Sequence, residues 1–189
     1  EVSFANLVGG ADAAWKTTLN LGAKVTLNGD NSDTGADVSG HVDVYFLDNL
    51  GTLGFNDLAS GSNFTADTDA GVSATQTVKF NGAITGGAAQ AYTTTITMKG
   101  NTRLNDINSL ANGYVALNLD GDAGVNQDLT ITTVGATGAN TNLSIGAANN
   151  TSTAIITNLV GGTGANTTTL NVGGNVIVDI RDDVSGNVS

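Results

Sequence analysis

Residues 92–99 read Tyr-Thr-Thr-Thr-Ile-Thr-Met-Lys, and this stretch points to the fold class. Ile96 and Met98 occupy one set of alternate positions, while Thr97 and Lys99 occupy the other. Because successive side chains of a β-strand point to opposite faces, a period of two indicates a strand with one buried face. The segment therefore predicts a half-buried β-strand.

The same alternation recurs along most of the 189 residues. It is clear at residues 24–27, 42–47 and 77–80. Further strands are predicted at residues 114–119, 129–134, 154–159 and 170–180. The sequence therefore predicts an all-β protein, with its strands arranged as a β-solenoid or as a β-sandwich.

The turns between these strands are expected to depend on glycine and asparagine. The chain has 26 Gly and no Pro, so residues that tolerate a positive φ must make the turns. Three Asn-Gly dipeptides, Asn28-Gly29, Asn81-Gly82 and Asn112-Gly113, suit type I′ turns. Such dipeptides between alternating segments predict β-hairpins.

One segment departs from the period of two. Leu104, Ile107, Leu110 and Ala111 follow a helical spacing, and Asn112-Gly113 is a sequence that can end a helix. The sequence therefore predicts one short helix there, which would cover one end of the β core.

Internal repeats carry the most information about organisation. Asn6-Leu7-Val8-Gly9-Gly10 returns as residues 158–162, residues 17–22 return as 168–173, and residues 37–42 return as 183–188. Residues 6–43 thus resemble residues 158–189, about 150 residues further on. We expect residues 1–189 to form a single β-rich module. The long repeat makes it either one unit of a longer repetitive protein or a module with two related β edges, unless the likeness reflects only a small vocabulary of Gly, Thr and Asn.

A second repeat is shorter. Residues 134–140 resemble residues 160–166, a spacing of about 26 residues within the region 129–180. One rung of a β-solenoid needs roughly 20 to 30 residues, so region 129–180 is predicted to be solenoid-like.

Composition excludes several classes of function. With no Cys and a single His, His41, the chain has no thiol chemistry, no Cys-ligated metal and no His cluster. A net charge of −11 with six Lys plus Arg gives no basic surface for nucleic acid, and no apolar run is long enough to span a membrane as a helix. Trp15 is the only Trp, so sugar-binding aromatic platforms are scarce, and it is interpreted as an anchor against the core or a neighbouring subunit. We expect no enzymatic activity.

Aspartate-rich loops are candidate calcium sites. Carboxylates close together in Gly-containing loops provide the oxygen ligands that Ca²⁺ prefers. The candidate ligands, taken in pairs, are Asp30 and Asp33, Asp67 and Asp69, and Asp120 and Asp122. The alternative for each loop is a solvated acidic turn.

Residues 161–166, Gly-Gly-Thr-Gly-Ala-Asn, resemble one copy of the glycine-rich nonapeptide of RTX proteins, which are secreted bacterial proteins. That family normally has Asp at the sixth position, where this chain has Asn166, and it runs the motif in tandem. Over its whole length the chain also resembles surface-layer proteins and repetitive adhesin or autotransporter passengers. The resemblance implies a location outside the cell.

Self-assembly is the function that the sequence favours. Natural β proteins protect exposed strand edges with Pro, Lys or bulges, and this chain has no Pro and few Lys. We expect an extracellular structural subunit that joins other copies of itself through β-edge contacts into a surface layer or filament. The alternative is an adhesin passenger segment, a solenoid stalk that binds a cell surface or a glycan.

Overall fold

The computed structural model describes residues 2–4, 6–22, 27–29, 37–48, 52–125 and 127–189. The chain is 60% strand and 2% helix, and its parallel sheets form a β-solenoid of about six turns. The predicted all-β class is confirmed, and the solenoid is the architecture found. No helix of the described residues is long and apolar enough to cross a membrane.

Two large sheets and a small one form the walls of the solenoid. The 9-stranded sheet has the order β1 (Val2–Phe4), β4 (Leu27–Gly29), β7 (Thr52–Phe55), β9 (Gln76–Thr85), β11 (Thr102–Ala111), β13 (Leu129–Val134), β15 (Ser152–Val160) and β17 (Val176–Ile180), and β18 (Val184–Ser185) also pairs with β15. The 7-stranded sheet consists of β3 (Thr17–Leu21), β6 (His41–Phe46), β8 (Asn63–Thr68), β10 (Thr94–Gly100), β12 (Gly113–Gly121), β14 (Thr141–Gly146) and β16 (Thr168–Val172). The small sheet pairs β2 (Leu7–Val8) with β5 (Val38–Ser39).

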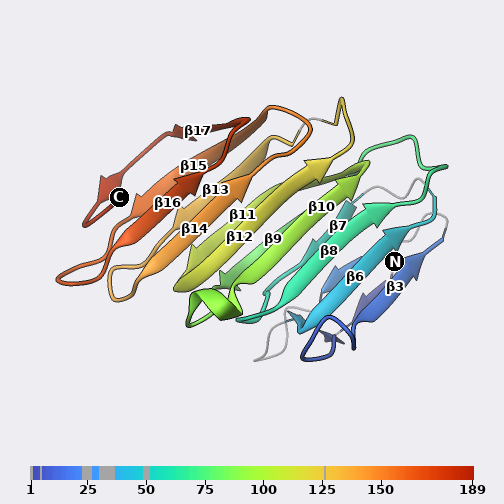
Figure 1. Cartoon of the computed structure of the whole chain (residues 1–189), viewed down its shortest axis with the longest axis horizontal. Coiled ribbons are helices and arrows are strands. Elements are labelled where there is room, and N and C mark those ends of the chain that lie inside the picture. The colour runs from blue at the N-terminus through green and yellow to red at the C-terminus, as the bar shows by residue number, and fades with distance from the viewer. Residues whose placement is uncertain (1, 5, 23–26, 30–36, 49–51, 126) are drawn as a thin grey trace.

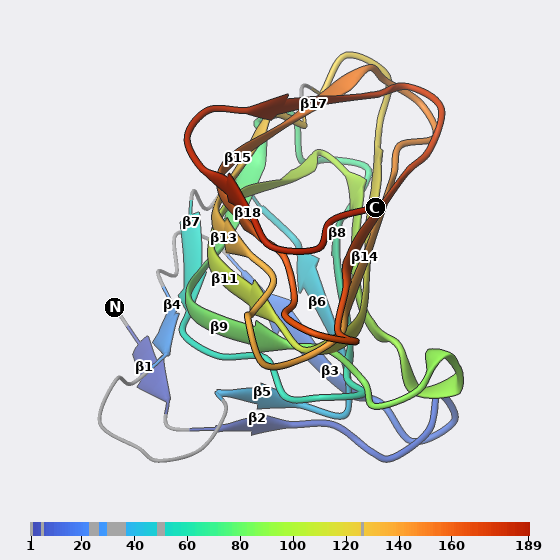
Figure 2. The ribbon, with the colours of Figure 1, turned by 90° about the vertical axis from the view of Figure 1, so that its left-hand side faces the viewer.

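Each coil of the chain contributes one strand to each large sheet. Figure 1 shows the strands side by side along the long axis, from the blue amino-terminal coils to the red carboxyl-terminal coils. Figure 2, seen along that axis, shows the two large sheets facing each other and β2 with β5 along the third side. Every strand therefore pairs with the strand one coil earlier or later.

Like residues stack on like in the interior. In-register parallel pairing places one apolar side chain per coil in a continuous column, which consists of Leu7, Val38, Leu58, Ile84, Leu110, Val134, Leu159 and Val184. The six inner members are at most 2% exposed. The apolar residues of the alternating pattern are thus the ones that face the interior, and they do so in every coil.

The hairpins predicted from the Asn-Gly dipeptides are wrong. All strand pairs of the described residues are parallel. Asn28-Gly29 lies in β4 and Asn81-Gly82 lies in β9. Asn112 (φ 60°) and Gly113 (φ 73°) do make a sharp turn, but it carries the chain from one sheet to the other. Of the three dipeptides, only Asn112-Gly113 marks a corner of the coil.

The predicted helix at Leu104, Ile107 and Leu110 is also wrong, because these residues lie in β11. The pairing of β11 with β9 shifts register between Leu104 and Asp106 and again between Ile107 and Ser109. At the first irregularity β11 has one residue more than β9, so the inward-facing Leu104 and Ile107 fall three residues apart instead of two. At the second the extra residue lies in β9. A bulged strand thereby reproduces the spacing of a helix. The helical element of the described residues is a 3₁₀ turn, η1 (Gln90–Tyr92).

Candidate functional site

The two copies of the long sequence repeat make the same backbone contacts. The Leu7 N–H donates to the Asp37 carbonyl at 2.7 Å, and the Leu159 N–H donates to the Asp183 carbonyl at 3.0 Å. The equivalent corner bonds run from the N–H of His41 to the carbonyl of Gly10 (3.0 Å) and from the N–H of Asn187 to the carbonyl of Gly162 (2.9 Å). The carboxyl-terminal coils therefore repeat the local structure of the first two.

A third copy of this corner lies between the other two. Tyr114 donates its N–H to the carbonyl of Gly87 at 2.9 Å, as His41 does to Gly10. In all three copies a Thr hydroxyl donates to a backbone carbonyl at 2.7 Å: Thr17 to Val8, Thr94 to Thr85 and Thr168 to Val160. The structural period is therefore three coils, or about 75 residues, half of the spacing seen in the sequence.

Sequence reasoning missed this middle copy, although a signal was present. Each copy reads Gly-Gly, then a short loop, then Thr-Thr, at residues 9–18, 86–95 and 161–169. The Leu and Asn residues that made the outer copies resemble each other are absent from the middle one, which reads Ile-Thr-Gly-Gly where the others read Leu-Val-Gly-Gly.

The last coil leaves inward-facing apolar side chains partly exposed. Val38 and Val184 are equivalent in the repeat. Val38 follows Asp37 and pairs with Leu7, and Val184 follows Asp183 and pairs with Leu159. Val38 is 0% exposed because a following coil covers it through Leu58, whereas Val184 is 57% exposed. We define the terminal stacking face as the side chains of Val178, Ile180, Val184 and Val188. In the first copy of the repeat, Val38 and Val42 are the equivalents of Val184 and Val188, and both are 0% exposed because the next coil covers them.

Two shallow pockets lie on the outer face of the 7-stranded sheet. The amino-terminal pocket has a volume of about 270 Å³ and is lined by Ala13, Lys16, His41, Asp43, Asn63, Phe64, Thr65, Thr95 and Thr97. The carboxyl-terminal pocket has a volume of about 510 Å³ and is lined by Gln90, Thr93, Tyr114, Val115, Ala116, Asn142, Ser144, Thr169 and Asn171. Each pocket is bounded by one of the loops that follow a Gly-Gly corner.

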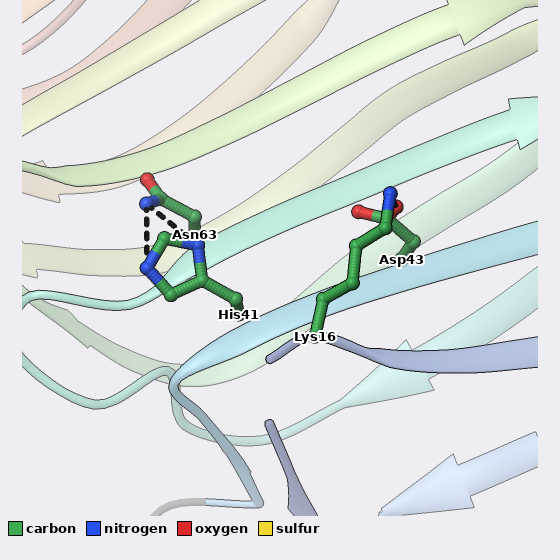
Figure 3. A network of polar contacts seen from close by, with 4 residues as sticks. All are labelled: Lys16, His41, Asp43 and Asn63. Atoms are coloured by element: carbon green, nitrogen blue, oxygen red, sulfur yellow. Dashed lines mark hydrogen bonds and ion pairs between the residues drawn. The ribbon is translucent and has the colours of Figure 1, made fainter. Parts of the chain in front are cut away.

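Polar side chains of adjacent coils meet in the amino-terminal pocket (Figure 3). The Lys16 ammonium group forms an ion pair with the Asp43 carboxylate. This carboxylate raises the pKa of Lys16 above its usual value, first by hydrogen bonding and then by its charge. The Asn63 amide nitrogen lies 3.2 Å from His41 Nδ1 and 3.4 Å from Nε2, so the amide lies beside the ring. The pocket thus combines a neutralised charge pair with an amide and an imidazole.

Each bounding loop carries an exposed aromatic residue. Trp15 is 75% exposed and Tyr92 is 70% exposed. Both hold the same place in the loop, since the Trp15 N–H donates to the Asp12 carbonyl and the Tyr92 N–H to the Ala89 carbonyl, at 3.1 and 2.8 Å. The interpretation of Trp15 as an anchor against the core is wrong, and its role as an anchor against a neighbouring subunit stays a prediction.

The predicted calcium ligands are distributed over separate strands. Asp67 lies in β8 and Asp120 in β12, with β10 between them. Lys99 of β10 is in register with Asp120. Asp30 and Asp33 lie outside the described residues. Among the residues that the structure describes, no three His, Cys, Asp or Glu side chains gather into a group that can hold a metal ion.

Groups of the chain already engage the oxygens of these loops. Asp67 and Asp69 each accept a hydrogen bond at 2.8 Å from the N–H of the next residue. In the turn of residues 120–122, which contains Asp122, the carbonyl oxygens accept hydrogen bonds from the side-chain amides of Asn149 and Asn150. A cation at this turn would coordinate the carboxylates or compete with the amides for the carbonyls.

Calcium binding by these aspartates stays a prediction. Calcium is expected to raise the melting temperature, because a ligand that binds only the folded state stabilises it by about 2.7 kcal/mol at 100 times its Kd. Circular dichroism melting in excess calcium and in excess chelator measures the shift. The variant with Asp120→Asn and Asp122→Asn is expected to lose part of it. Equal melting temperatures in both buffers contradict the prediction.

Fold and surface together define a parallel β-solenoid with three-coil periodicity, which is consistent with the repetitive surface-protein type. No protein-family model matches the chain, and searches of curated proteins and of solved structures find no match. Function is therefore inferred from the surfaces of the solenoid itself.

Proposed function

We propose that the chain is an extracellular structural subunit whose β-solenoid joins other copies end to end, so that they build a filament or a surface layer. The observation that carries this function is the difference between Val38 and Val184. The valine at this position of the repeat is 0% exposed in the first copy, as Val38, and 57% exposed in the last, as Val184.

Backbone groups support the same function. The last strands, β17 and β18, pair with β15 on one side only, and the first strands, β1 and β3, have one described neighbour each. An unpaired strand edge is a template for a strand of another chain. Each new backbone hydrogen bond contributes a net of about 1 kcal/mol, and burial of the terminal stacking face adds about 25 cal/mol per Å².

The proposed contact is heterologous, because the carboxyl-terminal end of one copy meets the amino-terminal end of the next. Such a contact propagates into open filaments or rings instead of closing as a two-fold dimer. A net charge of −11 opposes close approach of copies, so salt is expected to promote assembly by screening.

Replacing Val184 with Lys is expected to prevent assembly. The ammonium group would have to lose its water when a following coil covers it, whereas in the single chain the 57% exposed position tolerates it. Sedimentation velocity and electron microscopy of the purified chain measure the loss of filaments.

Ile177→Lys is the matched control for this variant. Ile177 belongs to the same last coil and is 56% exposed, but it pairs with Thr153 on the outer face. This control is expected to assemble like the parent chain. If the two variants behave alike, or if the parent chain forms a two-fold dimer, end-to-end stacking is wrong.

A further inference from the structure

The two surface pockets are copies of one another. His41 and Asn63 are paired across β6 and β8, and Tyr114 and Asn142 are paired in the same way across β12 and β14. Each pair begins at a residue that follows a positive-φ glycine, Gly40 or Gly113. The three-coil period thus places a ring beside an amide at the same point of both pockets.

Two further pairs of lining positions correspond. Thr65 and Ser144 lie two residues beyond the two asparagines, and Thr95 and Thr169 are the register partners of those asparagines on the next strand. All four side chains carry a hydroxyl group. A repeat that only maintained the fold would constrain the inward positions, but these side chains point outward, so the shared pattern indicates a shared ligand.

The chemistry of the pockets indicates an uncharged, hydroxyl-rich ligand. Amide and hydroxyl side chains both donate and accept hydrogen bonds, as sugar hydroxyl groups do. The carboxyl-terminal pocket has no Lys, Arg, Asp or Glu among its lining residues, and Lys16 and Asp43 neutralise each other in the other pocket. A phosphate or sulfate group would require unpaired cations.

The exposed aromatic residues complete this chemistry. Trp15 lies in the loop between two lining residues, Ala13 and Lys16, and Tyr92 lies between Gln90 and Thr93. Rings that are apolar on their faces and polar at one end suit ligands that are partly apolar and partly hydrated. The apolar face of a sugar ring is such a partner.

We propose that the outer face of the 7-stranded sheet carries two equivalent binding sites for a neutral glycan, one in each pocket, with Trp15 and Tyr92 as the aromatic contacts. The sites repeat after three coils, or about 14 Å, since neighbouring strands are about 4.8 Å apart. A linear polysaccharide spans both sites at once, so its second contact forms at high effective concentration. This glycan binding does not depend on end-to-end stacking.

Tryptophan fluorescence tests the first site directly, because Trp15 is the only Trp of the chain. The chain is titrated with neutral oligosaccharides (cello-, manno-, laminari- and chito-oligosaccharides) and, for comparison, with polygalacturonate and heparin. A neutral oligosaccharide is expected to change the emission saturably, in a manner insensitive to salt. The variant with Trp15→Phe and Tyr92→Trp moves the fluorophore to the second site and is expected to report the same ligand.

Side-chain variants then separate the two sites. Asn63→Ala and Asn142→Ala are each expected to weaken binding of a long polymer about tenfold, and the double variant is expected to abolish it. Asn158→Ala is the matched control, since Asn158 lies on the 9-stranded sheet, where its amide donates to the Thr132 carbonyl. Circular dichroism melting checks that all variants remain folded.

Three outcomes overturn the proposal. One is that no neutral oligosaccharide changes the fluorescence of either reporter. Another is that only the acidic polymers bind and that salt abolishes their binding. The third is that the double variant binds as well as the Asn158→Ala control.

Discussion

Replacing Phe64 with Ala is expected to lower the free energy of unfolding by about 3–5 kcal/mol. Phe64 is 0% exposed and joins the two large sheets, since its ring lies 5.2 Å from that of Phe55 and 5.6 Å from that of Phe80. Both contacts are edge-to-face, a geometry that adds about 0.5–1.5 kcal/mol per pair to the burial of apolar area. Truncation removes both contacts and leaves a cavity between the sheets.

Chemical denaturation followed by circular dichroism measures this loss. Phe64→Leu is the control, because it keeps most of the apolar volume and leaves a smaller cavity; it loses the two ring contacts, about 1–3 kcal/mol, and is expected to be more stable than Phe64→Ala. Each coil contacts mainly its neighbours, so the loss is expected to concentrate in the coils that contain the three phenylalanines. A loss for Phe64→Ala no greater than that for Phe64→Leu contradicts the tight packing seen in this cluster.

The strand content could be predicted from the sequence because burial in a coil imposes a period of two. Ile96 and Met98 are both fully buried, as the alternation of residues 92–99 requires. The direction of pairing could not be predicted in the same way, because an inward-facing residue has the same neighbours in sequence whether its partner strand runs parallel or antiparallel. Asn-Gly dipeptides suit a hairpin and a solenoid corner equally well, since both need a positive φ.

The pockets were beyond sequence reasoning for a related reason. His41 and Asn63 are 22 residues apart in the chain. Only the register between coils brings them together, and that register depends on the length of every turn between them. Trp15 is the only Trp of the chain and is therefore the residue to consider as an aromatic platform for a sugar. Its neighbours in the sequence do not indicate whether its ring is exposed or buried.

The Gly-Gly pairs could be recognised in the sequence as repeats. The reason why glycine is needed there is seen only in the stacked coils, where the pairs contact a glycine of the next coil. A Cβ on Gly113 would lie 2.2 Å from the Gly87 carbonyl oxygen and 2.7 Å from that of Gly86. Gly40 and Gly186 meet the corresponding carbonyls of the first and last copies in the same way. The repeat conserves a contact between successive coils that leaves no room for a side chain.

Replacing Gly113 with Ala is therefore expected to destabilise the fold by about 2–5 kcal/mol. A φ of 73° costs a residue with a Cβ about 1–2 kcal/mol, and forcing the methyl group against two carbonyls of the preceding coil adds about 1–3 kcal/mol. Denaturant titration of the variant and the parent chain measures the sum. The change is also expected to weaken the proposed glycan binding, because Tyr114 follows this glycine directly.

Gly164→Ala separates the two contributions. Gly164 has a φ of 66°, and nothing lies within 4 Å of the position of its Cβ. This variant carries the backbone cost without the clash, so it is expected to lose only about 1–2 kcal/mol. If the two glycine variants are equally stable, the preceding coil yields to the methyl group, and the close stacking of the corners is not what fixes the three-coil period.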